Sequence, residues 1–176
     1  MTSFDDPIAA RLGSQGGGNC WFSPATDVDA ARIMVIAEIG VNHDGRVDLA
    51  VELTRQAARA GADAVKLQLF DPRRLLSAQA GLARYQEQEG ESDIFAMLDR
   101  IKMTAADMQH VRAEAHALGL AFIVTPFCLE DIDGLRSLEV DLIKIASPDA
   151  VNVPLPEAVS QLDKPMLIST GTCAAN

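Results

Sequence analysis

Five short apolar runs alternate with segments of helical periodicity along residues 33–176 of this 176-residue chain. Each run is nearly continuous and partly β-branched, which is typical of a strand buried on both faces of a parallel sheet. Strands that alternate with helices build right-handed βαβ units, so the chain is predicted to be an α/β protein. The five expected strands cover residues 33–37, 64–70, 120–124, 141–145 and 165–169.

The segments between these runs carry helix start and stop signals. Thr104 is expected to be an N-cap, and Gly61 and Gly119 are expected to end helices. The expected helices cover residues 48–60, 93–101, 105–118, 129–138 and 156–162. A longer insertion occupies residues 71–91. Residues 1–32 hold four glycines and two prolines without any period, which predicts a loosely ordered N-terminal leader before a domain at 33–176.

Polar residues at the carboxyl end of every expected strand decide between the two folds that share this pattern. Active sites of (β/α)₈ TIM barrels collect at that rim, whereas a doubly wound sheet converges on one switch point. The barrel is therefore favoured. Residues 33–176 supply five strands, at about 29 residues each, and eight such units need roughly 230 residues. The predicted fold is an incomplete TIM barrel with five of its eight strands. The rim residues are Glu38, Lys66, Gln68, Thr125, Lys144, Ser147, Ser169 and Thr170.

The charge balance excludes several classes of partner. The chain has 15 basic and 25 acidic side chains, a net charge of -10, which argues against a nucleic-acid or anionic-membrane surface. Its apolar runs are far shorter than the ~18 residues of a transmembrane helix. The first residues lack a secretory signal, so a cytoplasmic location is expected. Cys20, Cys128 and Cys173 are expected to be reduced thiols, because their spacing suits neither a metal site nor a disulfide framework.

Two lysines, Lys66 and Lys144, lie inside expected strands, where an ammonium group is costly unless it is paired. One interpretation is a structural ion pair with an acid such as Glu38. The other is that both lysines project into the barrel mouth and bind a phosphate or carboxylate. The hydroxyls that would complete such an anion site belong to Thr125, Ser147 and Ser169.

Glu38 ends the first strand and precedes the segment 40–45, GVNHDG. Its carboxylate is interpreted as an ion-pair partner, or as a group that orients a substrate hydroxyl or transfers a proton. Asn42 and His43 are interpreted as turn residues before a helix. His110 and His116 fall on the helix at 105–118 and are expected at the surface or between helices, so the histidines predict no metal site.

Several motifs resemble the sialic acid synthase family, the N-acetylneuraminate synthases with their legionaminate and pseudaminate relatives. Residues 36–45, IAEIGVNHDG, resemble the opening strand of the family, and residues 61–68, GADAVKLQ, match its second strand. Further matches follow in order. They are Tyr85-Gln86, Glu91-Ser92, Met97-Leu98, Thr125-Pro126-Phe127, residues 144–147 (KIAS), Asn152, Pro154-Leu155 and residues 164–171 (KPMLISTG).

The resemblance implies a TIM barrel that condenses phosphoenolpyruvate with an N-acyl-hexosamine such as N-acetylmannosamine, releasing phosphate. It implies a divalent metal, Mn²⁺ or Mg²⁺, whose ligands are not in this chain, and a homo-oligomer such as a dimer. Glu38 and Asp149 would be catalytic, and Gln68 and Asp149 would bind the sugar. Asp149 stands where the family commonly has Glu, so the carboxylate is shorter by one methylene. The residues implied to bind phosphoenolpyruvate are Lys66, Thr125, Lys144, Ser147 and Ser169.

Two other functions compete with a synthase that is inactive or weak as this chain alone. One is a non-catalytic anion-binding or assembly module that pairs with another chain through the exposed edges of its first and fifth strands. The other is a 3-deoxy-ulosonate synthase-like enzyme, which acts on aldose phosphates. The motifs at 38–45 and 144–147 fit that class less well.

Overall fold

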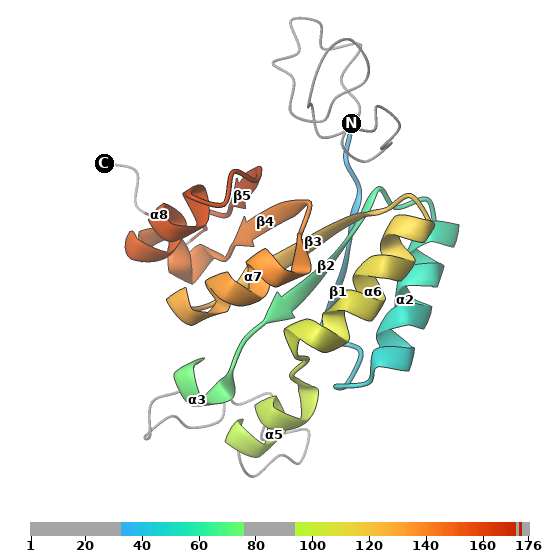
Figure 1. The fold of residues 1–176 in the computed structure, drawn as a ribbon, viewed down its shortest axis with the longest axis horizontal. Coiled ribbons are helices and arrows are strands. Elements are labelled where there is room, and N and C mark those ends of the chain that lie inside the picture. Colours follow the sequence, from blue (N-terminus) through green and yellow to red (C-terminus); the bar gives the residue numbers. More distant parts are fainter. Residues whose placement is uncertain (1–32, 76–93, 172, 174–176) are drawn as a thin grey trace, which may run out of the picture.

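The computed structural model describes residues 33–75, 94–171 and 173. Within them, five parallel strands form one sheet whose spatial order is the chain order, as Figure 1 shows. A doubly wound sheet reverses its strand order at a switch point, so this order is that of a barrel wall. The strands are β1 (Ile36–Gly40), β2 (Ala64–Leu69), β3 (Ala121–Pro126), β4 (Leu142–Ile145) and β5 (Met166–Ile168).

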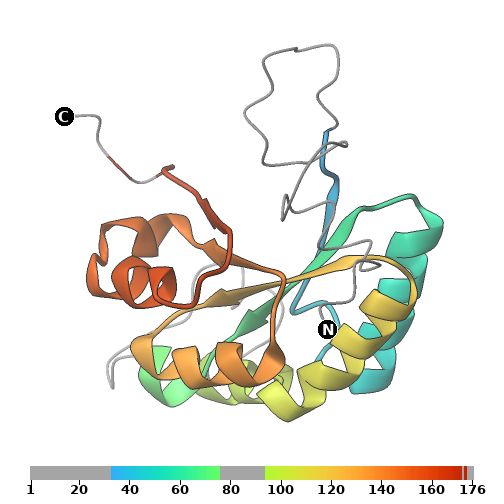
Figure 2. The ribbon, with the colours of Figure 1, turned by 45° about the horizontal axis from the view of Figure 1, so that its top comes forward.

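The main helices pack against one face of this sheet (Figure 2). In the wall of a barrel, helices cover the outer face of the sheet and the other face lines the interior, so this arrangement is that of a barrel wall. The helices are α2 (Val47–Arg59), α3 (Pro72–Leu75), α5 (Ile94–Ile101), α6 (Ala105–Ala117), α7 (Ile132–Leu138) and α8 (Pro154–Ser160). Two short 3₁₀ helices, η2 (Leu129–Asp131) and η3 (Ser147–Val151), follow β3 and β4.

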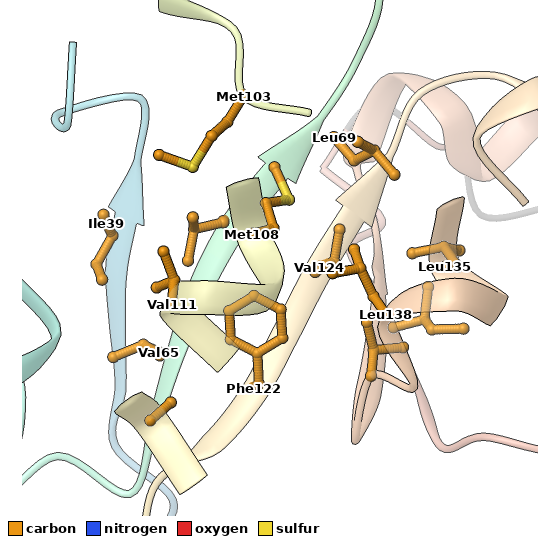
Figure 3. Packing of buried hydrophobic residues seen from close by; sticks show 14 of the residues in the cluster. Ile39, Val65, Leu69, Met103, Met108, Val111, Phe122, Val124, Leu135 and Leu138 are labelled. Atoms are coloured by element: carbon orange, nitrogen blue, oxygen red, sulfur yellow. The ribbon is translucent and has the colours of Figure 1, made fainter. Parts of the chain in front are cut away.

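Side chains along each strand point alternately to the two faces of the sheet, and each face carries its own apolar cluster. Val65 and Phe122 point toward the helices and pack in the larger cluster with residues such as Val111 and Leu138 (Figure 3). A smaller cluster on the opposite face consists of strand residues. Successive strand side chains point to opposite faces, so every second residue of each strand belongs to the inner face. The buried members of this inner cluster are Ala64, Ala121, Ile123 and Leu142.

The expected elements are confirmed, with shifts at their ends. The first strand begins at Ile36 instead of residue 33, because β2 begins only at Ala64, directly opposite Ile36. The last helix begins at Pro154, two residues earlier than expected, because proline suits the first turn of a helix. The 3₁₀ helix η3 was not predicted from the sequence.

The predicted N-cap of α6 is confirmed as a capping box. The Thr104 hydroxyl accepts the Asp107 N–H at 3.1 Å, and the Asp107 carboxylate accepts the Thr104 N–H at 3.1 Å. The leader at 1–32 and most of the insertion at 71–91 lie outside the described residues. No helix in the described parts of the chain is long and apolar enough to span a membrane.

Candidate functional site

The inner face of the sheet gathers the polar residues predicted at the strand ends. In the ladder, Glu38 lies opposite Lys66, and Gln68 lies opposite Thr125. Lys144 lies opposite Leu167, a residue that packs against the inner apolar cluster. Residues paired across a parallel ladder share a face, and so do residues two apart on one strand. These polar side chains therefore project into the barrel interior, above the inner apolar cluster.

Lys66 lies at the centre of the first part of this polar group. Its ammonium forms an ion pair with the Glu38 carboxylate and donates a 3.4 Å hydrogen bond to the Thr125 hydroxyl. The Lys66 side chain is only 15% exposed, and Thr125 is buried. The ion pair predicted between Glu38 and a strand lysine is thus confirmed for Lys66. For Lys66 the interpretation as one partner of a structural ion pair therefore holds. Whether the lysines also form an anion site depends on the partners of Lys144.

Lys144 has different partners. Its ammonium donates to the Ser169 hydroxyl at 2.7 Å and to the Ile145 carbonyl at 2.6 Å. Burial lowers the pKa of Lys144, and the positive charge of Lys66 lowers it further, while Glu38 opposes both effects. Within the described residues, no carboxylate forms a salt bridge with this ammonium. A bound anion would supply that missing negative charge.

The other predicted residues lie around this centre. Ser147 begins η3, and its hydroxyl accepts the Gly171 N–H at 2.8 Å, which ties the end of β4 to the loop after β5. Asp149 lies further along η3 and belongs to neither lysine's set of hydrogen bonds in the described structure. Burial raises the pKa of the Asp149 carboxyl, and a hydrogen bond with Asn152 opposes the rise. Among the residues predicted to bind phosphoenolpyruvate, the described hydrogen bonds join Lys66 with Thr125 and Lys144 with Ser169.

Asp131 supports the rim, a role that was not predicted from the sequence. Its buried carboxylate accepts the backbone N–H groups of Phe127 at 2.9 Å and Cys128 at 3.0 Å. These residues directly follow Thr125 and Pro126, so Asp131 fixes the loop that leaves the site. An acid at the beginning of a helix is a recognisable capping signal, but it does not reveal which loop the side chain will hold.

The loop after β1 is structural. His43 is buried, and its Nδ1 accepts the Gly45 N–H at 3.0 Å. Burial lowers the pKa of His43, which favours the neutral ring. Asp44 forms an ion pair with Arg100, at the end of α5. The interpretation of His43 as a turn residue is therefore confirmed, and its burial is an addition that the sequence did not reveal.

No group of three or more metal-binding side chains occurs in the described parts of the chain. The residues present there do not fit the divalent metal that the resemblance implies. The expectation that Mn²⁺ or Mg²⁺ takes its ligands from elsewhere stays a prediction.

Cys128 is expected to be a poor nucleophile. Burial and the nearby Asp131 carboxylate raise the pKa of its thiol to about 11. At pH 8 the reactive thiolate should be about 100-fold scarcer than for a cysteine of ordinary pKa. Peptide mass spectrometry after iodoacetamide treatment across a pH series should show slow alkylation that accelerates only at strongly alkaline pH. Alkylation at pH 8 as fast as that of free glutathione would contradict this prediction.

The strand order, the one-sided layer of helices and the polar inner rim define a TIM-barrel protein, of which the described residues form five strands. The profile of the NeuB family matches residues 53–176, and the chain belongs to that family.

Individual relatives agree. The chain is 38% identical over 141 residues to an N,N'-diacetyllegionaminic acid synthase of Legionella pneumophila, covering 79% of this chain and 40% of the relative. Its structure matches an N-acetylneuraminic acid (sialic acid) synthetase of Leptospira borgpetersenii with a TM-score of 0.70, at 25% identity over 81% of this chain and 46% of the other. A 3-deoxy-D-arabino-heptulosonate 7-phosphate synthase of Thermotoga maritima, 13% identical with a TM-score of 0.54 over 81% of this chain and 42% of the other, shares the fold alone. The chain thus spans about 40% of the length of the first curated relatives that it matches.

Proposed function

We propose that the protein acts as a nonulosonic acid synthase, condensing phosphoenolpyruvate with an N-acyl-hexosamine to form a sialic-acid-type sugar and phosphate. Membership of the NeuB family supports this proposal, as do relatives named as synthases of legionaminic and sialic acids. The observation that carries it is the pair of lysines on the inner face, of which Lys144 has no carboxylate partner among the described residues.

Phosphoenolpyruvate suits this pair because it carries two anionic groups, a phosphate and a carboxylate. Charge-assisted hydrogen bonds from ammonium groups to such oxygens are about twice as strong as neutral ones. We assign the binding of phosphoenolpyruvate to Lys66 and Lys144 together with the hydroxyls around them. These hydroxyls belong to Thr125, Ser147 and Ser169.

The chemistry forms two bonds and breaks one. The methylene carbon of phosphoenolpyruvate bonds to the aldehyde carbon of the open-chain sugar, whose oxygen takes up a proton to become a hydroxyl. The oxygen of a water molecule bonds to the adjacent enol carbon and gives up its protons, and the bond from that carbon to the phosphate oxygen breaks, which leaves a ketone and free phosphate. We assign Glu38 to the reacting centre, where its carboxylate would orient water or a substrate hydroxyl while Lys66 holds it in place. Gln68 and Asp149 are assigned to the sugar. No residue is assigned to a metal.

Titration calorimetry with phosphoenolpyruvate, followed by an activity assay, tests this function. We expect the 176-residue chain to bind phosphoenolpyruvate, but to release little phosphate with N-acetylmannosamine and Mn²⁺, because its described residues offer no ligand group for the metal. Inorganic sulfate at equal ionic strength serves as the control for unspecific anion binding. Absence of phosphoenolpyruvate binding would overturn the proposal, and robust turnover would contradict the expected weakness.

The exposed sheet edges favour a second candidate, an anion-binding assembly module. β1 and β5 are the outer strands of the sheet. Val35, directly before β1, is 53% exposed, and Ile168, the last residue of β5, is 48% exposed. Unpaired strand edges are ready to pair with another chain. Phosphoenolpyruvate binding without turnover, together with assembly of the chain into oligomers seen by light scattering, would favour this candidate. A homo-oligomer and a cytoplasmic location remain proposals under either function.

A further inference from the structure

The two strands that carry the site lysines begin with the same four-residue pattern. Residues 63–66 read DAVK and residues 141–144 read DLIK, so an aspartate precedes each lysine by three positions. The proposed function uses the lysines and leaves both aspartates without a role. Asp63 and Asp141 lie at the opposite end of the sheet from the rim, directly before the first residues of β2 and β4.

Asp63 binds the backbone of the neighbouring strand twice. Its N–H donates to the Val35 carbonyl at 2.8 Å, and its carboxylate accepts the Val35 N–H at 2.9 Å. Val35 lies immediately before β1, one residue from the first rung of the ladder, in which Ile36 pairs with Ala64. Asp63 is almost fully buried, whereas Val35 is 53% exposed, so the hydrogen bond between them is partly buried.

Asp141 repeats this arrangement two strands further on. Its N–H donates to the Phe122 carbonyl at 3.0 Å, and its carboxylate accepts the Phe122 N–H at 2.7 Å. The same carboxylate lies 2.8 Å from Nε2 of His116, near the end of α6. The next rung along the ladder pairs Ile123 with Leu142. In both strands, the aspartate thus forms hydrogen bonds with both the carbonyl and the N–H of the residue directly opposite it.

The carboxylate replaces a rung that the backbone cannot supply. In a parallel ladder the N–H of Val35 or Phe122 would bond to a carbonyl of the residues before the aspartate, but there the chain has turned away toward a helix. Phe122 is fully buried, so leaving its N–H unpaired would be costly. On both strands, an acceptor at one defined position holds the strands at one register. A slip of one residue would turn each lysine from the inner face to the helix face.

We propose that Asp63 and Asp141 are positioning residues that fix the register of β2 and β4, and thereby place the ammonium groups of Lys66 and Lys144 on the inner face. What those ammonium groups bind rests on the proposed function, but their placement does not. Each aspartate acts on the lysine of its own strand. That pairing separates this role from a general contribution to stability, which would affect both lysines alike.

Lysine-specific chemistry tests the pairing without any ligand. The full chain is reductively methylated with ¹³C-formaldehyde, and the rates at Lys66 and Lys144 are read by peptide mass spectrometry. We expect Asp63→Ala to accelerate methylation of Lys66 and Asp141→Ala that of Lys144, each about tenfold, because losing a buried acceptor makes local opening more frequent. Asp63→Asn and Asp141→Asn keep an acceptor oxygen and should restore most of the protection. Asp133→Ala, at an exposed acid on α7, is the control that should change neither rate.

Equal acceleration of both lysines in each alanine variant, or no acceleration in either, would overturn the proposal. If the alanine variants do not fold, hydrogen exchange in the unmodified chain decides. The Val35 amide should then exchange about as slowly as strand amides despite preceding β1, and fast exchange there would refute the role of Asp63. Protection of the lysines by added phosphoenolpyruvate forms a separate arm. Its absence would count against the proposed function alone.

Discussion

Replacing Lys144 with methionine is expected to lower the affinity of the chain for phosphoenolpyruvate about 10- to 100-fold. Methionine keeps an unbranched side chain of similar length but removes the ammonium that donates to Ser169. A hydrogen bond to a charged group contributes about 1.5–3 kcal/mol, which corresponds to this range of affinity. Lys144 should matter more than Lys66, because Glu38 already neutralises part of the Lys66 charge.

Titration calorimetry on Lys144→Met and on Lys164→Met forms the matched comparison. Lys164 is exposed and precedes β5, at the end of the sheet away from the rim, so its replacement should leave the affinity within about twofold. Equal losses in the two variants would show that the effect reflects overall charge, and would remove Lys144 from the site.

The affinity should also depend on pH through Lys144. Burial and the Lys66 charge lower the pKa of this ammonium, so it loses its proton at a lower pH than an ordinary lysine. Only the charged form attracts the anion. The affinity of the unmodified chain should therefore begin to fall, as the pH rises, below the pH at which ordinary lysines titrate. The alkaline decline should be weaker in Lys144→Met.

Replacing Gly45 with alanine is expected to destabilise the fold by about 3 kcal/mol or more. Gly45 has a φ of +73°, and a Cβ added to it would lie 2.1 Å from the backbone carbonyl oxygen of Arg100. That carbonyl belongs to the last turn of α5, so it cannot move aside as a flexible side chain would. The added methyl would force the loop after β1 away from α5 and break the bond between Gly45 and His43.

Gly61→Ala is the matched control for backbone strain. Gly61 has a similar φ of +84°, but a Cβ added there meets no atom within 4 Å. Its replacement should cost only the strain of a left-handed backbone, about 1–2 kcal/mol. Urea denaturation of both variants measures the difference. Equal losses of unfolding free energy would show that the contact with Arg100 yields easily, and would contradict the steric explanation.

Much of the fold could be predicted because its signals are local. A continuous apolar run such as residues 64–70 and a capped periodic segment such as α6 contain their own evidence, and both elements end within two residues of the prediction. The start of β1 could not be predicted in this way. Ile33 and Val35 are as apolar as the residues that follow, but they precede the first rung of the ladder.

The candidate site was likewise predictable from the sequence only in part. The sequence predicted that Lys66 and Lys144 are unusual, because a charge inside an apolar run is visible in one dimension. It left open which of them Glu38 would pair with. That choice depends on the ladder between β1 and β2, in which Glu38 lies directly opposite Lys66, 28 residues further along the chain.

By itself, then, the sequence determined the kind of protein: its alternating periods predict a parallel α/β fold, its strand lysines predict an anion site, and its ordered motifs resemble one family. The tertiary structure decided how the site is held together. In it, the carboxylates of Asp63, Asp131 and Asp141 accept hydrogen bonds from backbone N–H groups. The ammonium of Lys144 donates to a hydroxyl and a carbonyl. The physical reason is that periodicity and burial are encoded in neighbouring residues. A hydrogen bond between distant strands exists only once their register is set.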